Sequence, residues 1–398
     1  MSNNINHLAR NLIQSVQKNK QSEEIQVTQQ EGESIARAKM YSQSHEQTQL
    51  KTWTIEEIKS SRFNKEQKLE LYRNLSDFCL ESNNFILLKK IALEAISMNL
   101  DEEETLEFSA QLCLACVFLN DLHCLMDAAE TGLLISNCEA EIKISLYNIL
   151  CFSCCKLGLG FSVQMKEAAE EALLLPECSL EKKIEFFEYE CIACCNLNDY
   201  EGLQKAAENA LMLQEYCSKE KIKFLEYACI AYSNLKGYEG SKQTASEALL
   251  IKDCSRISQL TFFKYLCEAC CELKDYKGLK KALQDSDSLQ DCILFYKYLC
   301  ISCAQEKDYI GLKKAAENAL SLSECEEKIM YYKYLCEACF ELKDSKALKQ
   351  AATNAFNLNS CNGYEFLFIS YSLRAKIIEE NKIHVIIQES EFNTLIGL

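Results

Sequence analysis

Apolar residues recur three or four positions apart along most of this chain, which is the spacing of one face of an α-helix. In the segment around residues 293–322 the first such face is formed by Phe295, Tyr298, Leu299 and Ser302. A second face follows a polar break at 307–309 and is formed by Leu312, Ala316 and Ala319. Asp308 stands at the break, where its carboxylate can accept backbone N–H bonds of the second helix. The segment is therefore predicted to form helix A, a short turn and helix B.

The same pattern returns along the chain at intervals of 33 to 40 residues. The same helix B position can be followed through every copy: Ala92, Ala129, Ala169, Ala207, Ala245, Leu283, Ala316 and Ala352. No long stretch alternates apolar and polar residues, so a sheet is not expected. A fixed period of this length is typical of units that stack on their neighbours and share one core.

The repeat resembles the tetratricopeptide repeat. The residues that carry the resemblance are Tyr296, Leu299, Cys300, Asp308, Tyr309, Ala316 and Ala319, in that order along one unit. The chain departs from the family pattern because cysteine usually fills the small slot of helix A, and because Pro176 is its only proline. The resemblance implies an all-α fold, a right-handed α-α superhelix of about eight helical hairpins with capping helices.

Three regions are expected. Residues 1–50 are polar and are interpreted as a largely disordered tail, with a docking or export segment as the alternative. Residues 51–360 are expected to form the solenoid. Residues 361–398 lose the repeat pattern and are interpreted as degenerate capping helices, because terminal repeats must cover an open core. The alternative for this last region is an exposed sorting signal.

The composition narrows the function classes. The chain has 398 residues and a formal net charge of −16, and no basic stripe of the kind that binds nucleic acid is visible. No apolar run reaches the roughly 18 residues of a membrane span, and no secretory signal is evident, so a cytoplasmic protein is expected. Phosphate-binding, nucleophile-elbow and zinc-protease motifs are not found. An enzyme, a cofactor and a small-molecule substrate are therefore not expected.

The chain contains 25 cysteines, and six pairs have the C-x-x-C spacing. This spacing also occurs in zinc and thioredoxin sites. Here each pair falls within helix A, where close packing needs small residues, and histidine is scarce. Core packing is the preferred interpretation, and a metal site or thiol-based store is the alternative. Further cysteines precede the next helix A, and three of them are followed by predicted cap residues: Ser179, Ser218 and Ser255.

The solvent side of the A helices is the predicted partner-binding surface. One column of this surface contains the apolar residues Leu114, Phe152, Ile192 and Ile230. A neighbouring column contains first acids and then lysines: Glu188, Glu226, Lys264, Lys297 and Lys333. The two columns predict a groove that takes an extended or helical segment with apolar anchors and complementary charge. The alternative is that the apolar column packs between adjacent A helices and the charges form a solvated face.

The preferred function is a scaffold that binds a protein or peptide partner. The alternative is a secreted or translocated effector, or a chaperone of one, which a bacterium would export into a host cytosol.

Overall fold

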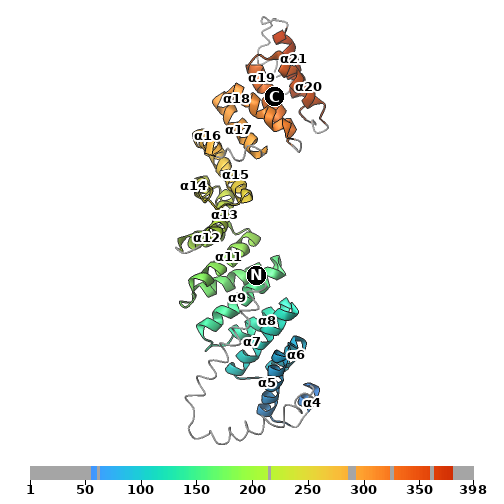
Figure 1. Cartoon of the computed structure of the whole chain (residues 1–398), viewed down its shortest axis with the longest axis vertical. Coiled ribbons are helices and arrows are strands. Elements are labelled where there is room, and N and C mark those ends of the chain that lie inside the picture. The colour runs from blue at the N-terminus through green and yellow to red at the C-terminus, as the bar shows by residue number, and fades with distance from the viewer. Residues whose placement is uncertain are drawn as a thin grey trace. The chain divides into compact units, whose positions relative to one another are not determined.

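A computed structural model describes residues 55–60, 63–213, 217–285, 293–322, 327–358 and 363–379. These residues form helices joined by short turns and contain no strand, which confirms the predicted all-α class. The chain divides into two compact units, Met1–Tyr216 and Cys217–Leu398. Within each unit the helices follow one another in chain order, as Figure 1 shows. The predicted N-terminal tail and the residues after 379 lie outside the described residues.

Unit 1 begins with a short helix that precedes four hairpins. Its helices are α4 (Ile55–Ser60), α5 (Lys65–Glu81), α6 (Phe85–Ile96), α7 (Glu102–Leu119), α8 (Leu122–Leu133), α9 (Ala140–Leu157), α10 (Ser162–Leu173), α11 (Leu180–Leu197) and α12 (Tyr200–Met212). A short 3-10 helix, Leu159–Phe161, lies between α9 and α10. The odd-numbered helices from α5 to α19 are the predicted A helices, and each contacts the B helix that follows it.

The described residues of unit 2 form four more hairpins and one helix after them. Its helices are α13 (Ser218–Asn234), α14 (Tyr238–Leu249), α15 (Arg256–Glu272), α16 (Tyr276–Asp285), α17 (Ile293–Glu306), α18 (Tyr309–Ser321), α19 (Lys328–Glu341), α20 (Ser345–Phe356) and α21 (Glu365–Glu379). The final helix packs on α20 and buries Phe368. It therefore occupies the place of one more A helix after the last complete hairpin.

The joint between helices A and B has a local cause. Lys307 adopts the left-handed conformation with φ of 57°, which ends α17. The N–H of Asp308 then donates to the carbonyl of Cys303 at 2.9 Å, a bond typical of a helix that ends in this way. The Asp308 carboxylate accepts the N–H of Gly311 at 2.9 Å and so caps α18. The predicted cap is confirmed here, and the same role falls to Asp121, Asp199, Asp275 and Asp344.

The starts of the A helices confirm two of the three predicted serine caps. The hydroxyls of Ser179 and Ser255 accept N–H bonds at the starts of α11 and α15. The prediction for Ser218 is wrong, because Cys217 is the N-cap and Ser218 is already helical. The Glu220 carboxylate accepts the N–H of Cys217 at 3.1 Å, and this bond places the helix start one residue earlier.

Small residues allow the helices to approach each other. All eight of the helix B positions that mark the repeat are buried, as are all twelve cysteines of the six C-x-x-C pairs. Alanine and cysteine side chains are short, so the backbones of neighbouring helices can come close without leaving a void. One apolar cluster joins α4 to α11 in unit 1, and another joins α17 to α21 in unit 2.

A charged ladder links successive B helices within each unit. A lysine in one B helix pairs with the aspartate that caps the next B helix: Lys89 with Asp121, Lys166 with Asp199, Lys242 with Asp275, and Lys313 with Asp344. The Nζ–Oδ2 distance is 2.7 Å in the last pair. Phe161 replaces the capping aspartate at the start of α10, and Met126 replaces the lysine in the preceding B helix, α8. No such ion pair can therefore form between these two helices. The hydrogen bond from Lys313 is the main cause that lowers the pKa of Asp344.

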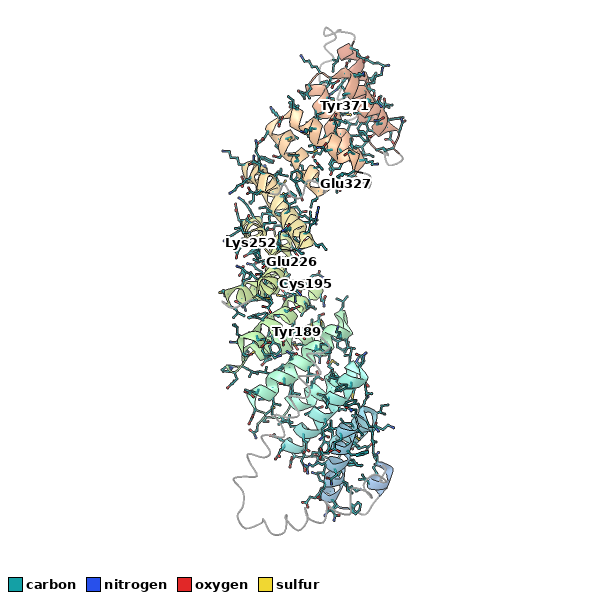
Figure 2. All side chains as sticks on the ribbon, in the orientation of Figure 1. Tyr189, Cys195, Glu226, Lys252, Glu327 and Tyr371 are labelled. Atoms are coloured by element: carbon teal, nitrogen blue, oxygen red, sulfur yellow. The ribbon has the colours of Figure 1, made fainter. Side chains whose placement is uncertain are left out.

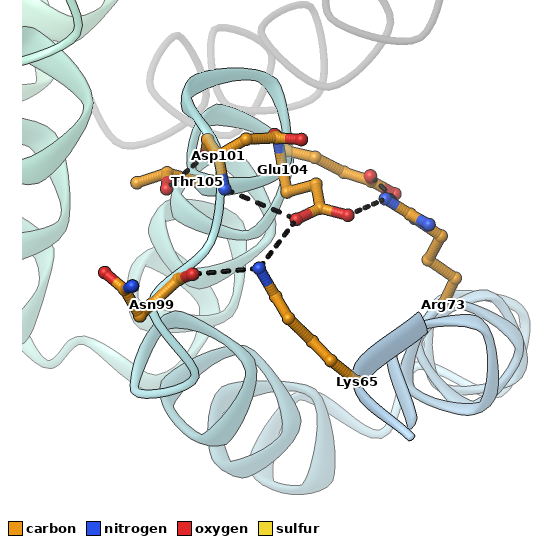
Figure 3. Close-up of polar contacts among 7 residues, drawn as sticks. Lys65, Arg73, Asn99, Asp101, Glu104 and Thr105 are labelled. Atoms are coloured by element: carbon orange, nitrogen blue, oxygen red, sulfur yellow. Dashed lines mark hydrogen bonds and ion pairs between the residues drawn. The ribbon is translucent and has the colours of Figure 1, made fainter. Parts of the chain in front are cut away.

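A second polar network joins the first two A helices, α5 and α7 (Figure 3). Arg73 Nε donates to Glu107 at 2.9 Å, and its guanidinium also lies 3.5 Å from Glu104. Lys65 donates to the carbonyl of Asn99 at 2.9 Å and lies 3.8 Å from Glu104. Burial by itself would lower the pKa of Arg73, but the two carboxylates outweigh it and raise that pKa.

The ladder predicts that the charge and the capping role of Asp344 are separable. Asn caps a helix about as well as Asp, so Asp344→Asn removes only the attraction to Lys313. We expect this change to cost at most about 1 kcal/mol, because the pair is half-exposed. Asp344→Ala removes the cap as well and should cost about 1 kcal/mol more. Both costs can be measured from the free energy of urea unfolding.

Salt separates the two contributions further. Lys313→Met should match Asp344→Asn at low salt, and the difference of either variant from the parent should shrink in 1 M salt. The extra cost of Asp344→Ala should persist there. An equal cost of the Asn and Ala variants would contradict the capping role.

Candidate functional site

The apolar column of unit 1 is mostly core. Leu114 on α7 and Phe152 on α9 are only 4% and 8% exposed and belong to the apolar cluster of the unit. Ile192 on α11 is half-buried and packs against the same cluster. The helices α9 and α11 are in contact, so packing between adjacent A helices accounts for Phe152, while Leu114 is covered within the same apolar cluster. The accessible part of the predicted surface in this unit consists of Ile192 and the half-buried Glu188.

In unit 2 the charged column is accessible. Glu226 and Ile230 on α13 are half-buried. The side chain of Lys264 on α15 is 52% exposed and that of Lys297 on α17 is 35% exposed, while Lys333 on α19 is also exposed. The A helices are neighbours here, since α13 contacts α15, Phe263 of α15 stacks on Phe295 of α17, and α17 contacts α19. The structure therefore presents three lysines on three successive A helices of one unit.

These lysines are only weakly neutralised by the chain itself. Lys264 lies 3.9 Å from Glu268, one turn further along α15. Lys297 lies 3.7 Å from Glu327, the exposed residue that precedes α19 (Figure 2). Exposed ion pairs at such distances contribute little. The three ammonium groups therefore lie at the surface without a close ion pair in the part of the chain that the structure describes.

Tyrosines form a column beside the charges that the sequence analysis missed. In five A helices a tyrosine lies two positions before the first cysteine of the pair. Helix α13 has no pair, and Cys229 occupies the position of its first cysteine. The tyrosines are Tyr189, Tyr227, Tyr265, Tyr298 and Tyr334. The side-chain hydrogen bond of Tyr298 is to Glu268. Burial raises the pKa of Tyr334, and raises that of Tyr371 on α21 to about 12. The hydroxyls of Tyr334 and Tyr371 are therefore neutral hydrogen-bond donors. The fixed offset from the cysteines was the signal that could have revealed the tyrosine column.

The cysteines serve as core residues. The twenty-two cysteines that the structure describes are free thiols, and the six pairs are buried. Burial raises the pKa of Cys300 and Cys336 to about 12 and that of Cys303 and Cys339 to about 11. Thiols with such values are poor nucleophiles because almost none is ionised. Across the described ranges no group of three or more potential ligands is placed to hold a metal.

One buried carboxylate breaks the repeat pattern. Glu190 on α11 is 8% exposed, at the position directly before the first cysteine of the pair. Leucine occupies this position in five other hairpins, at Leu112, Leu150, Leu266, Leu299 and Leu335. Burial, assisted by the nearby Glu170, raises the pKa of Glu190 to about 7. The core of unit 1 thus contains an acid that changes charge near neutral pH.

Stacked A–B hairpins with small buried residues at nearly every repeat define the class of this protein, an all-α solenoid of helical hairpins. No family model matches the chain, and no curated protein is similar to it. Among solved structures, the chain is similar to the C-terminal part of a TPR repeat-containing protein from Cytophaga hutchinsonii. The two share 14% sequence identity at a TM-score of 0.37, over 75% of this chain and 99% of the other.

The assignment to helical hairpins rests on the helices of this chain. None of the helices that the structure describes is both long enough and apolar enough to cross a membrane.

Glu190 predicts a pH-dependent stability. Because its pKa rises from an ordinary 4.5 to about 7 on folding, the folded state binds more protons between these values. Stability is therefore highest below pH 4.5 for this group and falls as the pH rises to about 7, by roughly 3 kcal/mol in total. Glu190→Gln should flatten this slope, and Glu190→Leu should stabilise unit 1 most at pH 8. Urea unfolding between pH 5 and pH 8 measures both.

The exposed Glu181, on the first turn of the same helix, supplies the control. Glu181→Gln should leave the slope unchanged and the stability within about 0.5 kcal/mol. A slope that survives in the Glu190→Gln variant would exclude Glu190 as its source.

The burial of the cysteines predicts two classes of thiol. In the native protein the twelve thiols of the six pairs should be alkylated at least about 100-fold more slowly than the exposed Cys217. After denaturation without reductant, most of the 25 cysteines should titrate as free thiols. Mass spectrometry of alkylated peptides measures both quantities. Rapid labelling of the pairs, or ten or more disulfides, would contradict the core-packing role.

Proposed function

We propose that the chain is a protein-binding scaffold and that the solvent side of its A helices holds a segment of a partner protein. The observation that carries this proposal is the row of accessible lysines on α15, α17 and α19. Glu226 and Ile230, on the neighbouring α13, supply an acid and an apolar contact in the same unit. In unit 1 the corresponding contacts are Glu188 and Ile192.

The chemistry of unit 2 specifies the kind of segment. Three lysines on successive A helices favour a partner with acidic residues at several points along its length. The hydroxyl of Tyr334, beside Lys333, can donate a hydrogen bond to a backbone carbonyl or a carboxylate of the segment. Ile230 favours an apolar residue at the end of the segment that lies near α13. The segment is therefore an acidic peptide with an apolar anchor.

The three lysines provide the test. Affinity capture on the full chain, followed by mass spectrometry, identifies the partner, and titration of the purified partner then gives its Kd. Changing Lys264, Lys297 and Lys333 together to Glu should weaken binding by at least about tenfold, because attraction becomes repulsion. The parent should lose affinity as salt increases, and the variant should lose much less.

A matched variant carries the same change of charge on B helices of unit 2, at Lys277, Lys346 and Lys349, which are exposed. It should bind as the parent does, within about twofold. If the A-helix variant binds as tightly as the parent at every salt concentration, this surface does not hold the partner.

A further inference from the structure

Helix α16 departs from the other B helices of the chain. At the helix B position that marks the repeat, the other seven hairpins have alanine, whereas α16 has Leu283. Leucine is bulkier than alanine and prevents the close approach that alanine permits. The B helices on either side, α14 and α18, have Ala245 and Ala316 at this position, and both are fully buried.

Cavities lie on both sides of α16. One, of about 690 Å³, is lined by residues of α14, α15 and α16 and includes Lys242, Gln259, Leu266 and Ala282. The other, of about 400 Å³, lies between α16 and α18 above α17. Leu283 lines the smaller cavity. This cavity exposes apolar side chains of the hairpin formed by α17 and α18 on the side of the B helices. Its volume falls in the range of about 300–1,000 Å³ that is usual for ligand pockets.

The floor of the smaller cavity is aromatic and aliphatic. Leu283, Phe295 and Leu299 line it together with Tyr296. The ring of Phe295 stacks on that of Phe263 with centroids 6.1 Å apart, and Tyr296 meets it edge-on at 5.6 Å. These contacts fix the orientation of the rings, so the floor is preformed for a flat or branched apolar side chain.

The rim of this cavity has two lysines and two carboxylates. Lys280 is paired with Glu306 at 2.8 Å, and the Asp308 carboxylate is engaged in capping α18. Lys314 on α18 also lines the cavity and is exposed. In the part of the chain that the structure describes, Lys314 forms no ion pair. Its exposed ammonium group is therefore the one on this rim to which a ligand carboxylate beside an apolar group could bind without displacing Glu306 from Lys280.

We propose that this cavity is an anchor pocket for a second peptide, in which one bulky apolar side chain is adjacent to an acidic residue. The apolar side chain enters between α16 and α18 onto Leu283 and Phe295, and the carboxylate binds Lys314. The pocket faces the B helices and shares no residue with the lysine row on the A helices. The proposal of this pocket is therefore independent of whether the A-helix surface binds a partner.

The experiment uses random twelve-residue peptides displayed on phage and selected on the full chain. We expect enrichment of peptides with Phe, Trp or Leu next to Asp or Glu, and synthetic copies then give the Kd. Gln284, an exposed residue of the rim, allows the mouth to be closed without disturbing the core. Gln284→Trp should weaken binding by at least about tenfold by occupying the pocket.

The charge is tested separately. Lys314→Glu should weaken binding by about tenfold, and replacing the peptide acid by Lys should restore most of the loss in this variant. Glu317→Trp, at the register of Gln284 in the next B helix, and Lys349→Glu are matched controls that should stay within about twofold of the parent. Circular dichroism verifies that every variant keeps its helix content.

Three results would overturn the proposal. One is a selection that enriches no peptides of this chemistry. Another is full affinity of the enriched peptide for the Gln284→Trp variant. The third is loss of that affinity when Lys264, Lys297 and Lys333 are changed to Glu, because the peptide would then bind the A-helix surface. Unchanged affinity in this triple variant, with loss in Gln284→Trp, supports the pocket even if the A-helix proposal fails.

Discussion

The close contact of helices through small side chains is the constraint on which the rest of this structure depends. A single hairpin cannot bury its apolar face, and a neighbour can cover that face only if the two backbones come close. Alanine in helix B and cysteine in helix A meet this need at nearly every repeat. Because cysteine is apolar as well as small, the chain accumulates thiols without using their chemistry, and burial keeps them protonated.

The polar groups reinforce this packing at the edges of the core. At four A–B joints an aspartate caps one helix with its first carboxylate oxygen and binds a lysine of an earlier B helix with its second, as Asp344 does for α20 and Lys313. One residue thus links a local turn to the stacking of hairpins. The joint itself depends on a left-handed residue, such as Lys307, and on a backbone bond to the second cysteine of the pair.

The features that distinguish one hairpin from another lie at positions where the residue differs from its equivalents in the other repeats. Glu190 places a carboxylate where other hairpins have leucine, and the buried site raises its pKa. Leu283 stands where other hairpins have alanine, and cavities accompany it on both sides of α16. The lysines of α15, α17 and α19 lie on a scaffold that requires no charge there. A repeat makes such departures visible, because each position is compared with its equivalents in the same chain.

The sequence by itself determined the hairpins, the aspartate caps, the small-residue contacts and the burial of the cysteine pairs. These features depend on helical spacing and on hydrogen bonds between residues a few positions apart, so a short stretch of the sequence is enough to predict them. Only the tertiary structure decided that Leu114 and Phe152 are core, that tyrosines flank the charged column, that Lys313 reaches Asp344, and that a cavity adjoins Leu283. The accessibility of a side chain, and the partner it meets, depend on the helix packed beside it, which is distant in the sequence.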